Sequence, residues 1–140
     1  MATAVDTLLV LVVDDEPSVR VFAGRALRDA GYEVMIASDG PEALGLVEAQ
    51  DRPFALFVVD VMMPRMRGDE VAQLIRRRDP DARVLYFTGY SDQLFESRQT
   101  LARYEAFIEK PVTAKGLLQA VSLLLFGHTD GPALETRSAT

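Results

Sequence analysis

Cysteine is absent from the 140-residue sequence, and an excess of basic residues is absent too. Without cysteine there can be no disulfide bond, no thiolate metal site and no cysteine nucleophile. The 15 Lys and Arg face 21 Asp and Glu, which gives a formal net charge of −6. This balance argues against direct binding of nucleic acid, whose phosphate backbone requires clustered basic side chains. Simple solubility explains most of the acidity.

Segments that would direct the chain into or across a membrane are also missing. Residues 1–6 have no basic start and the apolar stretch 8–13 ends in acids, so no signal peptide is expected. No apolar stretch approaches the roughly 18 residues of a membrane span. We therefore expect a cytoplasmic protein without membrane contact. The length suits one compact domain, and the 49% of hydrophobic residues can form a sizeable core.

What the sequence does contain is an alternation of apolar runs and helical patterns. Continuous runs of aliphatic residues indicate strands that are buried on both faces. Strands are expected at 8–13, 33–37, 54–59, 83–87 and 106–108. Apolar residues at helical spacing predict a helix after each strand. These helices are expected after Pro17, after Gly40, after Gly68, at 91–103, and from a Thr113 cap to residue 126.

The order of the expected elements predicts the fold class. Five strand–helix pairs indicate an α/β protein with a doubly wound, five-stranded parallel sheet and helices on both faces, the flavodoxin-like (βα)5 arrangement. No internal repeat or second domain is visible. The domain is expected to cover 1–127, and the polar, aperiodic residues 128–140 are expected to form a flexible C-terminal tail.

Polar residues follow the apolar runs at the ends of the expected strands. Asp14 and Asp15 follow the first strand, Asp60 the third, Thr88 the fourth and Lys110 the fifth. The carboxyl ends of parallel strands share one edge of the sheet, and ligands of open α/β folds bind outside that edge. We therefore expect these five residues to gather in one crevice.

Three carboxylates at one edge repel one another. At about 4 Å and an effective dielectric constant of 20, each pair costs on the order of 4 kcal/mol, which one lysine cannot fully offset. Either a carboxyl group takes up a proton or a hard cation binds, and oxygen ligands suit Mg²⁺ or Mn²⁺. With the cation beside it, Asp60 can act as the nucleophile toward a phosphoryl group. The backbone carbonyl of Met62 has the right reach for a further metal contact.

The remaining polar groups suit phosphoryl transfer, which depends on positioning and charge neutralisation. Lys110 and the cation could share the charge of the transferred oxygens, and the Thr88 hydroxyl could donate a hydrogen bond to one of them. Gly89 keeps the site open for an incoming donor.

These residues resemble the receiver domain of two-component response regulators, the CheY-like family. The resemblance covers about 8–126. Each matching segment is weak alone, but four segments in order, each closing a strand, form a specific signal. These segments are Val12–Pro17, Asp60–Gly68, Thr88-Gly89 and Glu109–Pro111.

The resemblance implies a role for each matching position in the metal and phosphoryl site. Asp60 would be the phosphoacceptor, and Asp14 and Asp15 the acidic pair that binds the metal. The backbone carbonyl of Met62 would complete the metal shell. Lys110 would match the family's lysine.

The resemblance also implies a switch. Thr88 would move to contact the phosphoryl group, and the aromatic ring of Phe107 would then turn inward. The peptide bond between Lys110 and Pro111 would be cis. On its own, an aromatic residue in a short strand is as well explained by core packing.

The function that the resemblance implies is a phosphoacceptor switch in a two-component phosphorelay. A sensor histidine kinase or phosphotransfer protein would donate the phosphoryl group to Asp60, with self-catalysed transfer and slow autodephosphorylation but no enzymatic turnover. Met62 and Tyr90 would set the phosphoryl lifetime by shielding the site from water. The downstream protein is unknown. No output domain follows in the sequence, which fits either a stand-alone regulator or an excised domain.

Two other functions would require different residues at these positions. A phosphohydrolase of the haloacid-dehalogenase type carries a second Asp two residues after its nucleophile, where this chain has Met62. A flavin or nucleotide carrier needs a Gly- or Ser/Thr-rich loop after the first strand, where this chain has Asp14, Asp15 and Glu16. Asp14 and Asp15 could also be a plain helix-start cluster.

The last expected helix has an unusually apolar surface. Leu117, Val121 and residues 124–125 can face the sheet, yet Leu118, Leu123 and Phe126 are apolar as well. Exposed apolar residues often mark a contact surface. The sequence therefore predicts a surface for a partner or for a homodimer, formed by the fourth helix, the fifth strand and the fifth helix.

Overall fold

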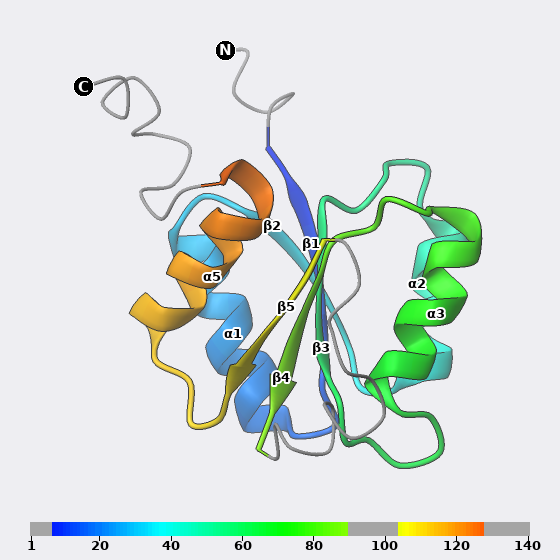
Figure 1. Ribbon diagram of the computed structural model, residues 1–140, viewed down its shortest axis with the longest axis horizontal. Helices are drawn as coiled ribbons and strands as arrows, with labels where there is room; N and C mark the ends of the chain where they lie inside the picture. Colours follow the sequence, from blue (N-terminus) through cyan, green and yellow to red (C-terminus); the bar gives the residue numbers. More distant parts are fainter. Residues whose placement is uncertain (1–6, 90–103, 128–140) are drawn as a thin grey trace.

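The computed structural model describes residues 7–89 and 104–127. In this part of the chain, five parallel strands form one sheet in the order β2-β1-β3-β4-β5 (Figure 1). The elements are β1 (Leu9–Val13), α1 (Pro17–Asp29), β2 (Glu33–Ala37), α2 (Gly40–Ala49), β3 (Leu56–Asp60), α3 (Gly68–Arg78), β4 (Val84–Thr88), β5 (Glu105–Glu109) and α5 (Ala114–Phe126). The predicted fold class is confirmed. The helix expected at 91–103 and the tail at 128–140 lie outside the described residues.

The sheet separates two apolar layers, as Figure 1 shows. Helices α2 and α3 cover one face, and α1 and α5 cover the other. Along β1, Leu9 and Leu11 join the first layer, whereas Val10 and Val12 join the second. Every residue of β1, β3 and β4 is buried for this reason. These strands therefore appear in the sequence as continuous apolar runs and not as an alternating pattern.

Local signals fix the helix ends. Pro17 opens α1, and Gly31 follows it with φ of 103°, a left-handed conformation that suits glycine. The side chain of Asp39 caps α2 by accepting a hydrogen bond from the Glu42 amide. The Thr113 hydroxyl accepts one from the Gly116 amide at 3.0 Å, so the predicted cap of α5 is confirmed.

A buried polar network ties the start of β5 to its neighbours. The side chain of Glu105 is fully buried, and its Oε2 lies 2.5 Å from Nη1 of Arg76 on α3. The hydroxyl of Tyr86 on β4 donates to the same oxygen at 2.8 Å. The carboxylate is thus paired with a cation and hydrogen-bonded, which a buried charge requires.

The apolar surface of α5 is smaller than the sequence predicts. Leu117 and Val121 are buried, and Leu118 packs against the same apolar layer. Leu118 is therefore half-buried and less exposed than the sequence predicts, because the apolar layer beneath α5 extends to it. Leu123 is 52% exposed and remains on the surface. Among the described helices, none has the length and hydrophobicity required to span a membrane.

Candidate functional site

The carboxyl ends of the central strands bring the expected polar residues together. Asp14 directly follows β1, Asp60 is the last residue of β3, and Thr88 is the last residue of β4. All three side chains are buried, whereas Asp15 is exposed. Carboxylate oxygens of Asp14, Asp15 and Asp60 lie within 4.8 Å of one another. The sequence prediction of an acidic cluster at this edge is confirmed.

Lys110 supplies a positive charge to this cluster from the end of β5. Its Nζ lies 3.2 Å from Oδ2 of Asp14 and 3.5 Å from Oδ2 of Asp60. It also donates a hydrogen bond to Oε1 of Glu16 at 3.2 Å. Sequence reasoning missed Glu16 as a partner of the lysine, although its place next to the acidic pair could have indicated it. One ammonium group is therefore shared among several carboxylates.

Burial and like charge perturb the titration of the cluster. Burial and, after it, the neighbouring charge of Asp14 raise the pKa of Asp60 to about 7, against the opposing effect of Lys110. Burial also raises the pKa of Asp14. Burial would lower the pKa of Lys110, but the charges of Asp14 and Asp60 outweigh it, so that this pKa is raised. The site thus holds more negative charge than its lysine can balance.

The donor atoms of the cluster fit a hard divalent cation. The Oδ1 of Asp14 accepts a hydrogen bond from the Glu16 amide at 2.9 Å. Its Oδ2 is buried and pairs with Nζ of Lys110 at 3.2 Å. Together with the carboxylates of Asp15 and Asp60, this oxygen offers the ligands that Mg²⁺ and Mn²⁺ prefer.

The loop from β3 to α3 folds back onto the end of its own strand. The amide of Met62 donates to Oδ1 of Asp60 at 3.2 Å, which fixes the carboxylate against the loop. The amide of Gly68, the first residue of α3, donates to the Val61 carbonyl at 2.9 Å. The Met62 side chain is 41% exposed. Its sulfur lies 3.4 Å from Nη1 of Arg67.

The remaining predicted residues lie beside this loop and around β4 and β5. The carbonyl of Thr88 accepts a hydrogen bond from the Lys110 amide at 2.8 Å, which joins the two strand ends. Gly89 is exposed next to Thr88. The peptide bond between Lys110 and Pro111 is cis, as the resemblance implies.

Phe107, the expected switch residue, lies on the face of the sheet that α2 and α3 cover. It is half-buried, packs against that apolar layer and is the register partner of Tyr86. Tyr90 lies outside the described residues.

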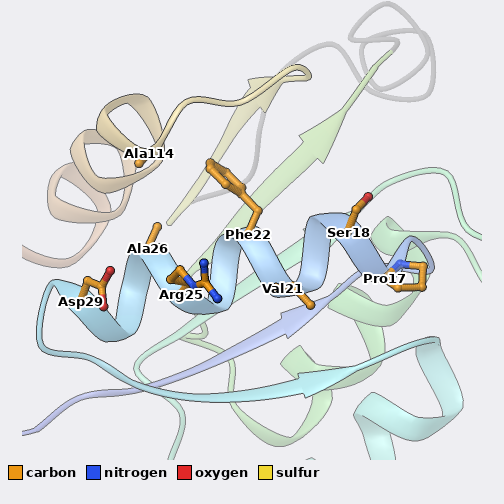
Figure 2. A pocket seen from close by; sticks show the side chains of 8 residues that line it. All are labelled: Pro17, Ser18, Val21, Phe22, Arg25, Ala26, Asp29 and Ala114. Atoms are coloured by element: carbon orange, nitrogen blue, oxygen red, sulfur yellow. The ribbon is translucent and has the colours of Figure 1, made fainter.

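A groove on α1 leads toward this site. Figure 2 shows Phe22 and Ala26 pointing from α1 toward α5, where Ala114 lies. The cavity along α1 measures about 680 Å³. A second cavity of about 420 Å³ reaches Lys110, and the two share Ser18 and Phe22 among their lining residues. The two cavities therefore adjoin on α1, and the second reaches the lysine that pairs with the acidic cluster.

Comparison with known proteins identifies the family. The family model of the response regulator receiver domain matches residues 10–122. The chain belongs to this receiver family. Receiver domains act as switches in two-component signalling, in partnership with histidine kinases or phosphotransfer proteins.

Individual relatives support this assignment. The receiver domain described here is 41% identical over 117 residues to Response regulator MprA of Mycobacterium leprae, covering 83% of this chain and 50% of that protein. It is 34% identical over 116 residues to Sensor kinase CckA of Brucella abortus, covering 83% of this chain and 12% of that protein. The chain thus spans half or less of the length of these two relatives.

Solved structures show the same fold. Chemotaxis protein CheY4 of Vibrio cholerae superimposes with a TM-score of 0.73 at 30% identity, covering 85% of this chain and 99% of that one. The receiver domain of the hybrid histidine kinase CckA gives 0.72 at 33% identity, covering 84% and 98%. The flavodoxin-like receiver fold expected from the sequence is confirmed.

Proposed function

We propose that Asp60 accepts a phosphoryl group from a sensor histidine kinase or a phosphotransfer protein. The observation that carries the proposal is the buried carboxylate of Asp60, held between a second buried carboxylate and the ammonium group of Lys110. In the transfer, a carboxylate oxygen of Asp60 attacks phosphorus and the P–N bond of the donor phosphohistidine breaks. The imidazole nitrogen keeps the bonding electron pair and takes a proton from solvent.

Four groups of the chain would hold Mg²⁺ or Mn²⁺: the side chains of Asp14, Asp15 and Asp60 and the backbone carbonyl of Met62. When bound, the cation supplies positive charge that screens the carboxylates and draws the phosphoryl oxygens toward the site. The ammonium group of Lys110 supplies a second positive charge. Lys110 Nζ already lies near Asp60 and can pair with a phosphoryl oxygen as negative charge moves there.

The phosphorylated state would act on a partner through β4 and β5. The Thr88 hydroxyl would contact a phosphoryl oxygen, and the half-buried ring of Phe107 would turn further inward. A tenfold change in a two-state equilibrium needs about 1.4 kcal/mol, roughly what one added hydrogen bond supplies. The surface that carries the output, to a downstream protein or a second copy of the chain, would include β5 and the exposed Leu123 of α5. We expect Leu123→Glu to weaken that association and leave phosphorylation unchanged.

The donor protein would lie along the groove of α1. The groove is apolar, its Phe22 and Val21 are 36% and 58% exposed, and it continues to Lys110. We expect Phe22→Glu to slow transfer from the protein donor while labelling by a small-molecule donor stays normal. An equal effect on both donors would contradict this placement.

Turnover of foreign phosphoesters is not supported. The residue two positions after Asp60 is Met62, which has no group to activate water. The aspartyl phosphate would instead decay by slow autodephosphorylation, with Met62 and Tyr90 limiting the access of water.

Labelling of the intact chain tests the proposal. Acetyl phosphate with Mg²⁺ should add one phosphoryl group, detected by intact mass and located by peptide mapping. Asp60→Asn should abolish the label, whereas Asp51→Asn, at an exposed carboxylate in the loop before β3, should keep it. A label that survives Asp60→Asn unchanged would refute the assignment of the acceptor.

A further inference from the structure

Gly68, the first residue of α3, lies directly against the backbone of Asp60. A Cβ atom at this position would lie 2.2 Å from the carbonyl oxygen of Asp60 and 2.9 Å from its carbonyl carbon. It would also lie 2.9 Å from Cγ1 of Val59. The φ of Gly68 is not in the left-handed region, so the requirement for glycine is one of space.

The other described glycines do not share this feature. A Cβ at Gly40 would meet only side chains, at 2.8 Å from Sδ of Met66 and 2.9 Å from Cγ2 of Val71, and flexible side chains can move aside. A Cβ at Gly45 would have no neighbour within 4 Å. Among the described glycines, Gly68 alone would press on backbone atoms, which move only together with the strand.

We propose that Gly68 is a positioning residue for phosphoryl transfer, which lets α3 approach β3 closely enough to fix the Asp60 carboxylate. This inference rests on the proposed function. The close approach permits the hydrogen bond from the Gly68 amide to the Val61 carbonyl at 2.9 Å. That bond closes the loop whose Met62 amide holds Oδ1 of Asp60.

A methyl group at Gly68 forces α3 and the end of β3 apart. The bond to Val61 is then lost or the Asp60 backbone shifts, and both changes displace its carboxylate from Asp14 and Lys110. Groups that share one cation or one phosphoryl group tolerate little displacement, since a shift of about 1 Å can cost about a hundredfold in rate. Gly68→Ala is therefore expected to affect both cation binding and phosphorylation in molecules that are folded.

The first measurement uses Mn²⁺ alone, with free Mn²⁺ followed by electron paramagnetic resonance on the full chain. We expect Gly68→Ala to bind Mn²⁺ about tenfold more weakly, and its labelling by acetyl phosphate to slow by about tenfold to a hundredfold. Gly45→Ala adds the same methyl group in open space and should match the wild type. Ala72→Gly weakens the same helix α3 without adding an atom near Asp60, so its folded molecules should keep normal Mn²⁺ affinity.

Circular dichroism gives the folded fraction by which each affinity is corrected. If Gly68→Ala is largely unfolded at 25 °C, the comparison is made at 10 °C in the Gly45→Ala background, which strengthens α2. Wild-type Mn²⁺ affinity and labelling rate in folded Gly68→Ala would overturn the inference and leave the proposed function intact. Absence of labelling in the wild-type chain would overturn the proposed function itself.

Discussion

The buried acidic cluster predicts that removal of the Asp60 charge stabilises the protein. The folded state holds the Asp60 proton more tightly than the unfolded chain does, because burial and the charge of Asp14 raise the Asp60 pKa to about 7 from its ordinary value of 3.8. The wild-type free energy of unfolding must therefore fall as pH rises between these two values. Asp60→Asn removes the ionisable group and with it this loss.

The size of the effect follows from the pKa. One pKa unit corresponds to about 1.4 kcal/mol, so the rise to about 7 sets a ceiling of about 4 kcal/mol above neutral pH. Relaxation around the charge reduces this figure. Lys110 loses one partner in the variant but keeps Asp14 and Glu16, each at 3.2 Å, so no isolated cation is left. We expect Asp60→Asn to be more stable by about 2–4 kcal/mol at pH 8, and the difference to shrink by more than half at pH 5.

Urea unfolding between pH 5 and pH 8, with a chelator to remove divalent cations, measures this difference. Asp51→Asn, at an exposed carboxylate, is the matched control and should change stability little at any pH. The reasoning would be refuted if Asp60→Asn gained nothing at pH 8. A gain of equal size at pH 5 and pH 8 would also refute it, because the stabilisation would then be unrelated to the proton.

Three further predictions concern the cation and the core. Mg²⁺ at about ten times its Kd should raise the unfolding free energy of the wild type by about 1.4 kcal/mol, and thermal shifts should show a smaller increase for Asp15→Asn. Tyr86→Phe should cost about 1 kcal/mol in urea unfolding because the buried carboxylate of Glu105 loses one hydrogen bond but keeps Arg76; no loss would mean that the bond contributes nothing. Thr113→Ala should cost about 1 kcal/mol through loss of the α5 cap, and Thr113→Ser should restore most of it.

Much of the site could be predicted because it depends on strand ends. Once the apolar runs identify parallel strands, the residues that follow them must share one edge, and this places Asp14, Asp60, Thr88 and Lys110 together. The pattern also gave the five strands to within a residue or two at their ends. β5, for example, extends from Glu105 to Glu109 instead of covering only 106–108.

Other features could not be predicted because they depend on distances between atoms of different elements. No periodic pattern in the sequence predicts that Lys110 pairs with Glu16. None predicts that Gly68 lies against the Asp60 carbonyl either. The partial burial of Leu118 likewise depends on how α5 packs against the apolar layer that it shares with α1. The apolar composition of α5 alone therefore overstated its exposed surface.

The buried carboxylate of Glu105 holds the start of β5 in place through side-chain bonds to two other elements. Its bonds to Arg76 and Tyr86 anchor the start of the strand to α3 and β4. From Glu105 to Glu109 the strand extends over about 13 Å, at roughly 3.3 Å per residue, and Lys110 follows it directly. At the other end, a backbone hydrogen bond from Lys110 to Thr88 joins the chain to β4, and the Lys110 side chain pairs with the acidic cluster. A displacement of Lys110 is therefore expected to move the β5 backbone near Phe107 more than the backbone at Glu105. The position of α3 should stay unchanged.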